Sequence, residues 1–303
     1  MSTAFLTDSP STDQLRSFAR SIGQILLQRN AATGVLIFAA VCAFSTRLAC
    51  ALVIGALTGG IVAYIVEDAD SPTMRDDLYG FNGALAALAA FTFIHDDSQA
   101  GAVAIVSAML ATALSLRLRN LLRRFRLPVY SSPAIIVTWC WLPLFADATS
   151  SGASASATST TTAWLEAILA GFAPIVFTSG VLAGTLLLVS LCAARPAHAA
   201  WAIAGSTVGL SLHALAGAPD AMLLSGACGF NATLTALATS KYGVRATLAG
   251  IVVAVLIERA AASLGIISLT APFVLATWAV QATIQRTDAS ANHGDSHVVH
   301  PSA

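Results

Sequence analysis

Long apolar stretches dominate the sequence and limit what the chain can fold into. Runs of about 15 to 25 residues, rich in Ala, Leu, Val and Gly, follow one another with short polar segments between them, and about 20 apolar residues in a helix cross the hydrocarbon core of a bilayer. Apolar residues make up 56% of the chain and charged residues 10%, which is far from the composition of a soluble domain. Because the runs are apolar on all sides, they predict membrane-spanning helices rather than a large soluble helical core.

The apolar runs form two groups of five, and a shorter apolar segment precedes each group. The first group comprises Ala31–Phe44, Leu48–Val66, Leu78–Ile94, Ala100–Leu118 and Leu127–Phe145, after the short segment Leu15–Leu27. The second group comprises Gly180–Ala194, Ala197–Ala216, Ala221–Thr239, Thr247–Leu264 and Thr270–Ile284, after the short segment Trp164–Phe177. The sequence therefore predicts an all-α integral membrane protein with ten transmembrane helices.

A stretch rich in Ser, Thr and Ala separates the two groups and has the composition of a flexible linker. We divide the chain into a polar N-terminal segment (1–14), a first repeat (15–145), this linker (146–163), a second repeat (164–284) and a hydrophilic tail (285–303). The tail has no apolar periodicity and is predicted to be disordered.

The two groups also share motifs, which indicates a duplication. "LYGFNGALAALA" at Leu78–Ala89 resembles "ACGFNATLTALA" at Ala227–Ala238. Two further landmarks recur in the same order: "SSPA" in the first group corresponds to "TAPF" in the second, and Gly34 corresponds to Gly184. Chance similarity in a chain rich in Ala and Leu would not reproduce Phe-Asn and Pro.

An odd number of crossings in each repeat places the second repeat in the opposite orientation to the first. The positive charges fit this topology if both termini are cytoplasmic and the linker is extracellular. The residues then predicted on the cytoplasmic side are Arg119, Arg123, Arg124, Arg126, Arg195, Lys241, Arg245 and Arg286. Inverted repeats are a transport architecture, with the solute site near the membrane midplane. We expect the two short segments to be re-entrant pore helices that line a polar cavity.

Several strings resemble the urea transporter family in its bacterial form. They are "IGQILLQRNAATG" at Ile22–Gly34, the two "GFN" blocks, "LPVYSSPA" and "LTAPF". The resemblance extends across roughly residues 15 to 285. It implies a passive, channel-like urea permease of the cell inner membrane, with ten spanning helices, two re-entrant helices, a pore in each protomer, contact with lipid and assembly as a homotrimer.

The resemblance also assigns pore residues to positions of this sequence. It implies that Phe81 and Leu85 wall a first slot and that Phe230 and Leu234 wall a second. It implies a hydroxyl at the pore centre from Ser131 and Thr270, an edge carbonyl from Gln24 and an aromatic wall from Phe177. A second group of candidate pore-lining residues comprises Leu27, Pro174, Asn82 and Asn231, of which the two asparagines are interpreted mainly as helix caps or interhelical hydrogen-bonding residues.

Two positions break the symmetry of these slots. Pro174 stands where symmetry with Gln24 calls for Gln or Glu, and Leu27 stands where symmetry with Phe177 calls for an aromatic residue. A proline side chain neither donates nor accepts a hydrogen bond. The second slot is therefore expected to be weaker, wider or adapted to another small amide.

The sequence does not favour an enzyme, a cofactor, a metal site or a nucleic-acid partner. The apolar runs contain few ionisable residues, which favours passive conduction over ion coupling. Near the ends of their runs, Glu258 and Arg259 are expected to snorkel, and His213 is expected to be interfacial. Two alternatives stay open: a channel for ammonia or a short-chain amide, and a non-transporting membrane scaffold.

Overall fold

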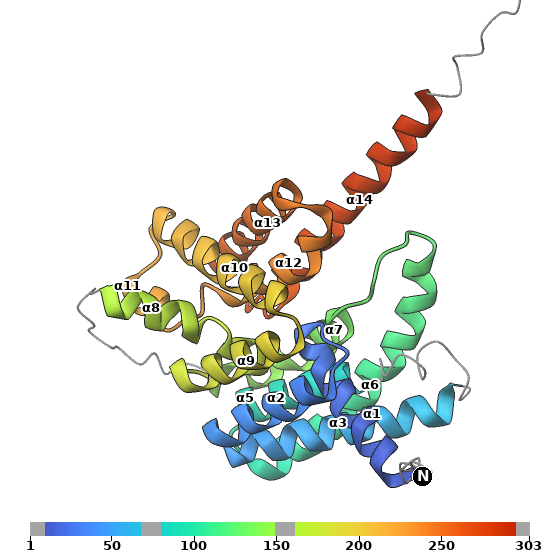
Figure 1. Cartoon of the computed structure of the whole chain (residues 1–303). Helices are drawn as coiled ribbons and strands as arrows, with labels where there is room; N and C mark the ends of the chain where they lie inside the picture. The colour runs from blue at the N-terminus through green and yellow to red at the C-terminus, as the bar shows by residue number, and fades with distance from the viewer. Residues whose placement is uncertain (1–9, 68–79, 149–160, 295–303) are drawn as a thin grey trace, which may run out of the picture.

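The computed structural model describes residues 10–67, 80–148 and 161–294, and in these ranges the chain forms helices and turns without strands (Figure 1). Four short 3-10 helices are labelled η. The first half contains α1 (Pro10–Gly23), η1 (Gln24–Leu26), α2 (Ala31–Phe44), α3 (Thr46–Val66), α5 (Phe81–Phe93), α6 (Asp97–Arg123), α7 (Ser132–Trp141) and η2 (Leu142–Ala148). The second half contains α8 (Thr161–Ala170), η3 (Ala173–Val176), α9 (Val181–Ala194), α10 (Pro196–Leu215), α11 (Asp220–Leu224), α12 (Phe230–Thr239), η4 (Ser240–Tyr242), α13 (Val244–Ser263) and α14 (Ala271–Gly294).

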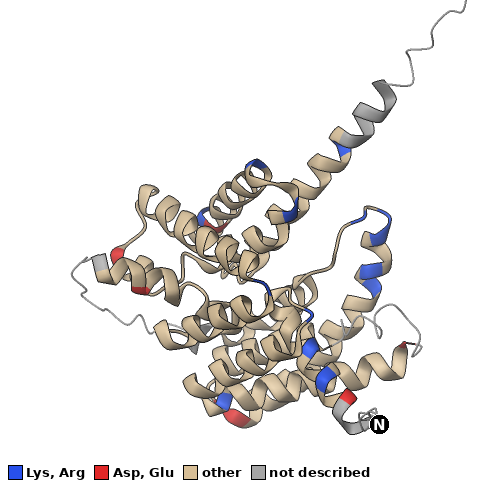
Figure 2. Cartoon of the chain, viewed as in Figure 1, with Lys and Arg blue, Asp and Glu red and all other residues tan. Residues whose placement is uncertain are grey.

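The surface of the helices is that of a membrane protein. Large apolar side chains such as Leu57, Ile61 and Ile65 on α3 are exposed, and charged residues are sparse and lie mostly near helix ends (Figure 2). Within the described ranges, α3, α6 and α13 are long and apolar enough to cross a membrane, and two bent helix pairs raise the total to five. The ten crossings stay a prediction, because several of the predicted runs form shorter helices.

Each short apolar segment ends in a tight turn that bends the chain back. α1 with η1 meets α2 at an angle of 73°, and α8 with η3 meets α9 at 79°. The turns have the same backbone: Leu27 has φ of 58° and Phe177 has φ of 59°. The N–H of each residue donates to a carbonyl three residues earlier, of Gln24 and of Pro174. Gln24 therefore matches Pro174 in the structure, as the sequence comparison predicted.

A glycine allows the arms of each bent pair to touch. A methyl group on Gly34 of α2 would lie 1.7 Å from the carbonyl oxygen of Ala19, and one on Gly184 of α9 would lie 1.9 Å from that of Leu169. Real Cβ atoms do not approach other atoms this closely. The two bent pairs meet in the centre of the molecule, where α2 packs against α9 and η1 contacts η3.

Two apolar runs that were predicted to cross the membrane contain short helices. α5 begins at Phe81 and has 13 residues, and α12 begins at Phe230 and has 10, so at 1.5 Å per residue they extend only about 20 and 15 Å. The predicted run Ala221–Thr239 is not one helix, because the chain turns at Gly226, whose φ is +80°. A side chain on Gly226 would meet the backbone of Ala170 at 2.5 Å.

The end of the chain differs from its prediction. α14 continues to Gly294 and leaves the helical body as a long arm, so residues 285–294 are helical and not disordered (Figure 1). Helix can continue there because residues 285–294 contain no Pro, and Gly occurs only at the last position. The rest of the tail (295–303), most of the polar start (1–9) and most of the linker (149–160) lie outside the described residues.

Candidate functional site

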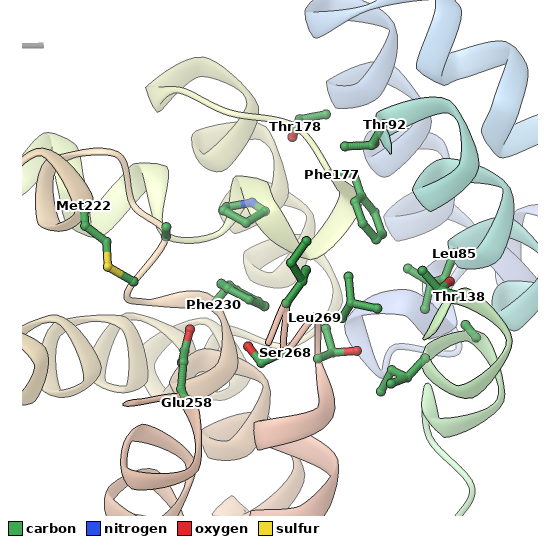
Figure 3. Close-up of a pocket in the computed structure, with 16 residues that line it drawn as sticks. Leu85, Thr92, Thr138, Phe177, Thr178, Met222, Phe230, Glu258, Ser268 and Leu269 are labelled. Carbon is green, nitrogen blue, oxygen red and sulfur yellow. The ribbon is translucent and has the colours of Figure 1, made fainter. Parts of the chain in front are cut away.

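Three cavities lie next to one another, and two of them are lined by residues of both halves. The first, named here the Phe81 cavity, has a volume of about 450 Å³ and is lined by Gln24, Leu27, Phe81, Asn82, Ser115, Arg119, Arg123, Leu127, Pro128, Val129 and Tyr130. The central cavity has about 20 Å³ and is lined by Gln24, Ile25, Leu27, Phe81, Leu85, Tyr130, Ser131, Ile175, Leu234, Thr270 and Phe273. The Phe230 cavity has about 360 Å³ and includes Leu85, Pro174, Phe177, Phe230 and Thr270 in its lining (Figure 3).

Shared residues connect the three cavities into a row. Phe81 and Gln24 line both the Phe81 cavity and the central cavity. Leu85 and Thr270 line both the central cavity and the Phe230 cavity. The central cavity, at about 20 Å³, has room for little more than one water molecule, so it is the narrow part of the row.

Four helices begin at this row. α5 starts at Phe81, α7 at Ser132, α12 at Phe230 and α14 at Ala271. The first N–H groups of a helix have no partner within the helix and give its N-terminus a partial positive charge. The two bent pairs bring the C-terminal ends of η1 and η3 to the same region. The row is thus surrounded by oriented backbone dipoles.

A pair of hydroxyl groups closes the centre of the row. The Oγ of Ser131 and the Oγ1 of Thr270 lie 2.7 Å apart and share a hydrogen bond between the two halves. The residues before them, Tyr130 and Leu269, each have φ of 50°. This left-handed conformation turns the chain sharply into α7 and α14, so that Ser131 and Thr270 face each other.

The two asparagines of the Phe-Asn motifs fix these turns. The Nδ2 of Asn82 donates to the carbonyl oxygen of Tyr130 at 3.0 Å, and the Nδ2 of Asn231 donates to that of Leu269 at 3.2 Å. The Oδ1 of Asn231 also accepts from the N–H of Phe273 at 3.3 Å. Asn231 is fully buried and lies outside the linings of the three cavities, and both ends of its amide bind backbone of another segment, which is the interhelical hydrogen bonding expected of it.

The other predicted site residues line the row. Gln24, Phe81, Leu85, Ser131, Phe177, Phe230, Leu234 and Thr270 each line at least one of the three cavities, and so do Leu27, Pro174 and Asn82. Phe81 and Leu85, one helical turn apart on α5, both face the central cavity. The structure therefore brings together residues that lie far apart in the sequence.

Aromatic and hydroxyl side chains make up much of the Phe230 cavity. Phe177 and Phe230 stand on two sides of the cavity, with Leu269 between them (Figure 3). Phe93 packs edge-on against Phe177, with ring centroids 6.3 Å apart, which holds the Phe177 ring in place. The polar atoms of the wall come from residues that include Thr92, Thr138, Thr178 and Ser268.

Sequence reasoning missed one residue of this region, Tyr130, and misplaced two, Glu258 and His213. Tyr130 lines two of the cavities, and its hydroxyl accepts a hydrogen bond from Gln281 at 2.9 Å. Glu258 is 6% exposed and lines the Phe230 cavity, so it does not snorkel to the membrane surface. His213 is 0% exposed and packs against Glu258, so it is not interfacial. A carboxylate inside the run Thr247–Leu264 was the available signal.

A row of apolar and aromatic walls with hydroxyl and amide groups suits a small, uncharged, polar solute. Within the part of the chain that the structure describes, no three His, Cys, Asp or Glu side chains come together as a metal site requires. A family model described as "Urea transporter" matches residues 15–284. The chain belongs to the urea transporter family.

Membership of the urea transporter family covers nearly the whole chain and implies transport of urea across a membrane. The family is one of transporters and not of enzymes. A comparison with curated proteins gave no match. The cavity row of this urea transporter runs through the matched region, from Gln24 to Phe273.

Proposed function

We propose that the chain is a passive urea channel of the cytoplasmic membrane and that urea crosses through the row of three cavities within each protomer. The observation that supports this most directly is the sharing of lining residues between neighbouring cavities, with the Ser131–Thr270 hydrogen bond at the narrow centre. No charged side chain among the described residues lines the central cavity, which favours conduction without a coupling ion.

Urea is planar and neutral, with N–H donors along its edges and one carbonyl oxygen. In the proposed pathway, Phe81 and Leu85 hold its faces on one side of the centre, and Phe177 and Phe230 hold them on the other. The side-chain carbonyl of Gln24 accepts an N–H from the edge of the solute. At the centre, Ser131 and Thr270 exchange their mutual hydrogen bond for bonds to the solute, so that it is never without polar partners.

The proposal includes the architecture of two inverted five-helix repeats with ten crossings, each with a re-entrant helix. Matching features of the two halves support it, among them the equal φ angles of Leu27 and Phe177 and the equivalent hydrogen bonds of Asn82 and Asn231. Assembly as a homotrimer in lipid, cytoplasmic termini and an extracellular linker belong to the same proposal.

One alternative has an observation in its favour. The Pro174 side chain in the Phe230 cavity offers no hydrogen-bond acceptor, and a wider or less polar slot suits a short-chain amide such as acetamide. Channels for ammonia and a non-transporting scaffold are the other outcomes that an experiment has to separate.

Stopped-flow shrinkage of proteoliposomes in a urea gradient tests the proposal. We expect urea permeability well above that of empty vesicles and independent of sodium and proton gradients. Parallel gradients of acetamide and ammonia identify the preferred solute. Urea permeability equal to that of empty vesicles would contradict the proposal, and flux of none of the three solutes would favour the scaffold.

A further inference from the structure

The wall of the Phe230 cavity contains a buried carboxyl group, that of Glu258. Glu258 belongs to α13, is 6% exposed and lines the cavity together with Phe230 and Pro174. Figure 3 shows its side chain extending towards Phe230, with the oxygen at that end. A carboxyl group in an apolar wall is costly unless it is paired or hydrogen-bonded. A carboxyl group at this point therefore needs a hydrogen-bonding or charged partner.

His213 contacts the carboxyl group of Glu258 but does not satisfy its capacity for hydrogen bonds. The Nε2 of His213 lies 3.6 Å from the Oε2 of Glu258, too far for a good hydrogen bond, and His213 has no hydrogen-bond partner in the structure for either ring nitrogen. The neighbouring Arg259 donates to the carbonyl of Ala216, at 3.1 Å. His213 thus packs against the carboxyl group, which also borders the cavity.

The corresponding position of the other half carries the opposite charge. Equivalent turns follow α6 and α13: the N–H of Leu127 donates to Leu122, and the N–H of Ile266 donates to Ala261. Counted back from the equivalent residues Tyr130 and Leu269, Glu258 matches Arg119, and the alternation of buried and exposed residues along the two helices matches in this register.

Arg119 lines the Phe81 cavity as Glu258 lines the Phe230 cavity. Arg123, one turn further along α6, also lines the Phe81 cavity. The row of cavities therefore has guanidinium groups towards one end and a carboxyl group towards the other. Charge at these matched positions distinguishes the two ends of the proposed pathway.

The carboxyl group lies in the cavity whose other side-chain acceptors are hydroxyl groups, with no amide carbonyl among the described residues that line it. Gln24 gives the Phe81 cavity a side-chain carbonyl, and the matched Pro174 gives the Phe230 cavity none. Glu258 comes from a different helix but borders the same cavity as Pro174. It can therefore supply the missing acceptor from across the cavity.

We propose that Glu258 is a solute-binding residue of the Phe230 cavity that accepts N–H groups from a planar amide or amidine. This inference rests on the proposed function for its physiological solute, urea. Two carboxyl oxygens can accept two parallel N–H groups, a geometry that the edge of urea presents. Guanidinium has the same trigonal shape, N–H groups on every edge and a positive charge. The Phe230 cavity is thus expected to bind guanidinium, which Arg119 and Arg123 would disfavour in the Phe81 cavity.

Calorimetric titration of guanidinium chloride into the detergent-solubilised protein tests this directly, with sodium chloride as the ionic control. We expect wild type to bind guanidinium, Glu258→Gln to bind it about threefold more weakly and Glu258→Met about tenfold more weakly, because Gln keeps one acceptor and Met keeps none. In proteoliposomes, the same order is expected for inhibition of urea flux by guanidinium. Glu166→Met removes an exposed carboxylate on α8 and is the matched control.

The outcomes separate the inference from the proposed function. Guanidinium binding that is absent in wild type, or unchanged in both Glu258 variants, overturns the role of Glu258. Absent urea flux with Glu258-dependent guanidinium binding contradicts the channel but keeps the binding site. If Glu258→Met does not fold, the nearly isosteric Glu258→Gln still decides, since size exclusion shows whether it has the wild-type profile.

Discussion

The turns that end the two short apolar segments have the same backbone conformation but different side chains. Leu27 and Phe177 share a left-handed φ and the same hydrogen bond, whereas the residues three positions earlier are Gln24 and Pro174. The backbone conformation therefore does not depend on the side chain that faces the cavity. The backbone of the two turns stays matched while the side chains that line the cavities diverge.

The helix contacts beside Gly80 and Gly229 also combine a matched backbone with different side chains. In the first half, Ser21 of α1 accepts a hydrogen bond from the N–H of Gly80 at 3.0 Å. In the second half, the matched residue is Gly171, and Ser206 of α10 fills the space beside Gly229. One hydroxyl occupies each junction, but a different helix supplies it. The matched scaffold thus tolerates exchange of side chains where the total volume is kept.

The largest effect on stability is expected for substitutions that overpack the two bent helix pairs. Gly34→Ala and Gly184→Ala each place a methyl group within 2 Å of a carbonyl oxygen, so both are expected to destabilise the protein by roughly 3 kcal/mol, the upper range for overpacking. Thermal unfolding followed by size exclusion measures this. Gly101→Ala is the control, since a methyl group there meets nothing within 4 Å. If one variant is as stable as the wild type and the other is not, the two halves are not equivalent at this contact.

The next largest effect concerns the two phenylalanines that start α5 and α12. Phe81→Ala and Phe230→Ala each remove an aromatic wall of a cavity. An aromatic contact contributes about 1 kcal/mol in addition to the burial of apolar area, which corresponds to roughly a fivefold change in selectivity between solutes. We expect N,N'-dimethylurea to gain permeability relative to urea in stopped-flow measurements. Phe44→Ala, at an exposed position of α2, controls for loss of an aromatic ring. Unchanged flux and selectivity in both variants would remove the two residues from the pathway.

Substitution of Pro174 by Gln should make the two ends more alike. The new side-chain carbonyl adds one acceptor to the Phe230 cavity, so urea is expected to saturate flux at a concentration about threefold to fivefold lower, as one net hydrogen bond allows. Gln24→Leu should shift half-saturation in the opposite direction. Concentration-dependent stopped-flow flux measures both, and a Pro174→Gln protein with wild-type half-saturation would mean that this position does not face the solute.

The smallest effect is expected at the hydroxyl pair. Ser131→Ala or Thr270→Val removes the hydrogen bond between the two hydroxyls and one polar partner for the solute, with a net cost of about 0.5 kcal/mol, the low end for a neutral hydrogen bond. We expect urea permeability to fall about twofold, and by similar factors in the two variants. Thr207→Val, at a hydroxyl that bonds only within α10, serves as the control. A large fall in one variant alone would show that the halves contribute unequally at the centre.

The sequence predicted the parts of the molecule that local patterns determine. The apolar runs and the ends of the two short segments near Leu27 and Phe177 follow from hydropathy and from the repeated motifs. The positions of the cavity-lining residues follow from the resemblance to the urea transporter family. The break at Gly226 was not predicted, because it depends on contact with Ala170 in a distant helix. Glu258 was misplaced for a similar reason: its position near a helix end says nothing of which side of α13 faces the cavity.

The four helices that begin around the row have a consequence for ions. The N-termini of α5, α7, α12 and α14 place partial positive charges around the narrow centre. A cation that shed its water there would meet repulsion from several sides, whereas a neutral dipole could turn its carbonyl oxygen towards the N–H groups. In the proposed pathway, the helix N-termini would therefore favour a neutral solute over a cation at the narrow centre.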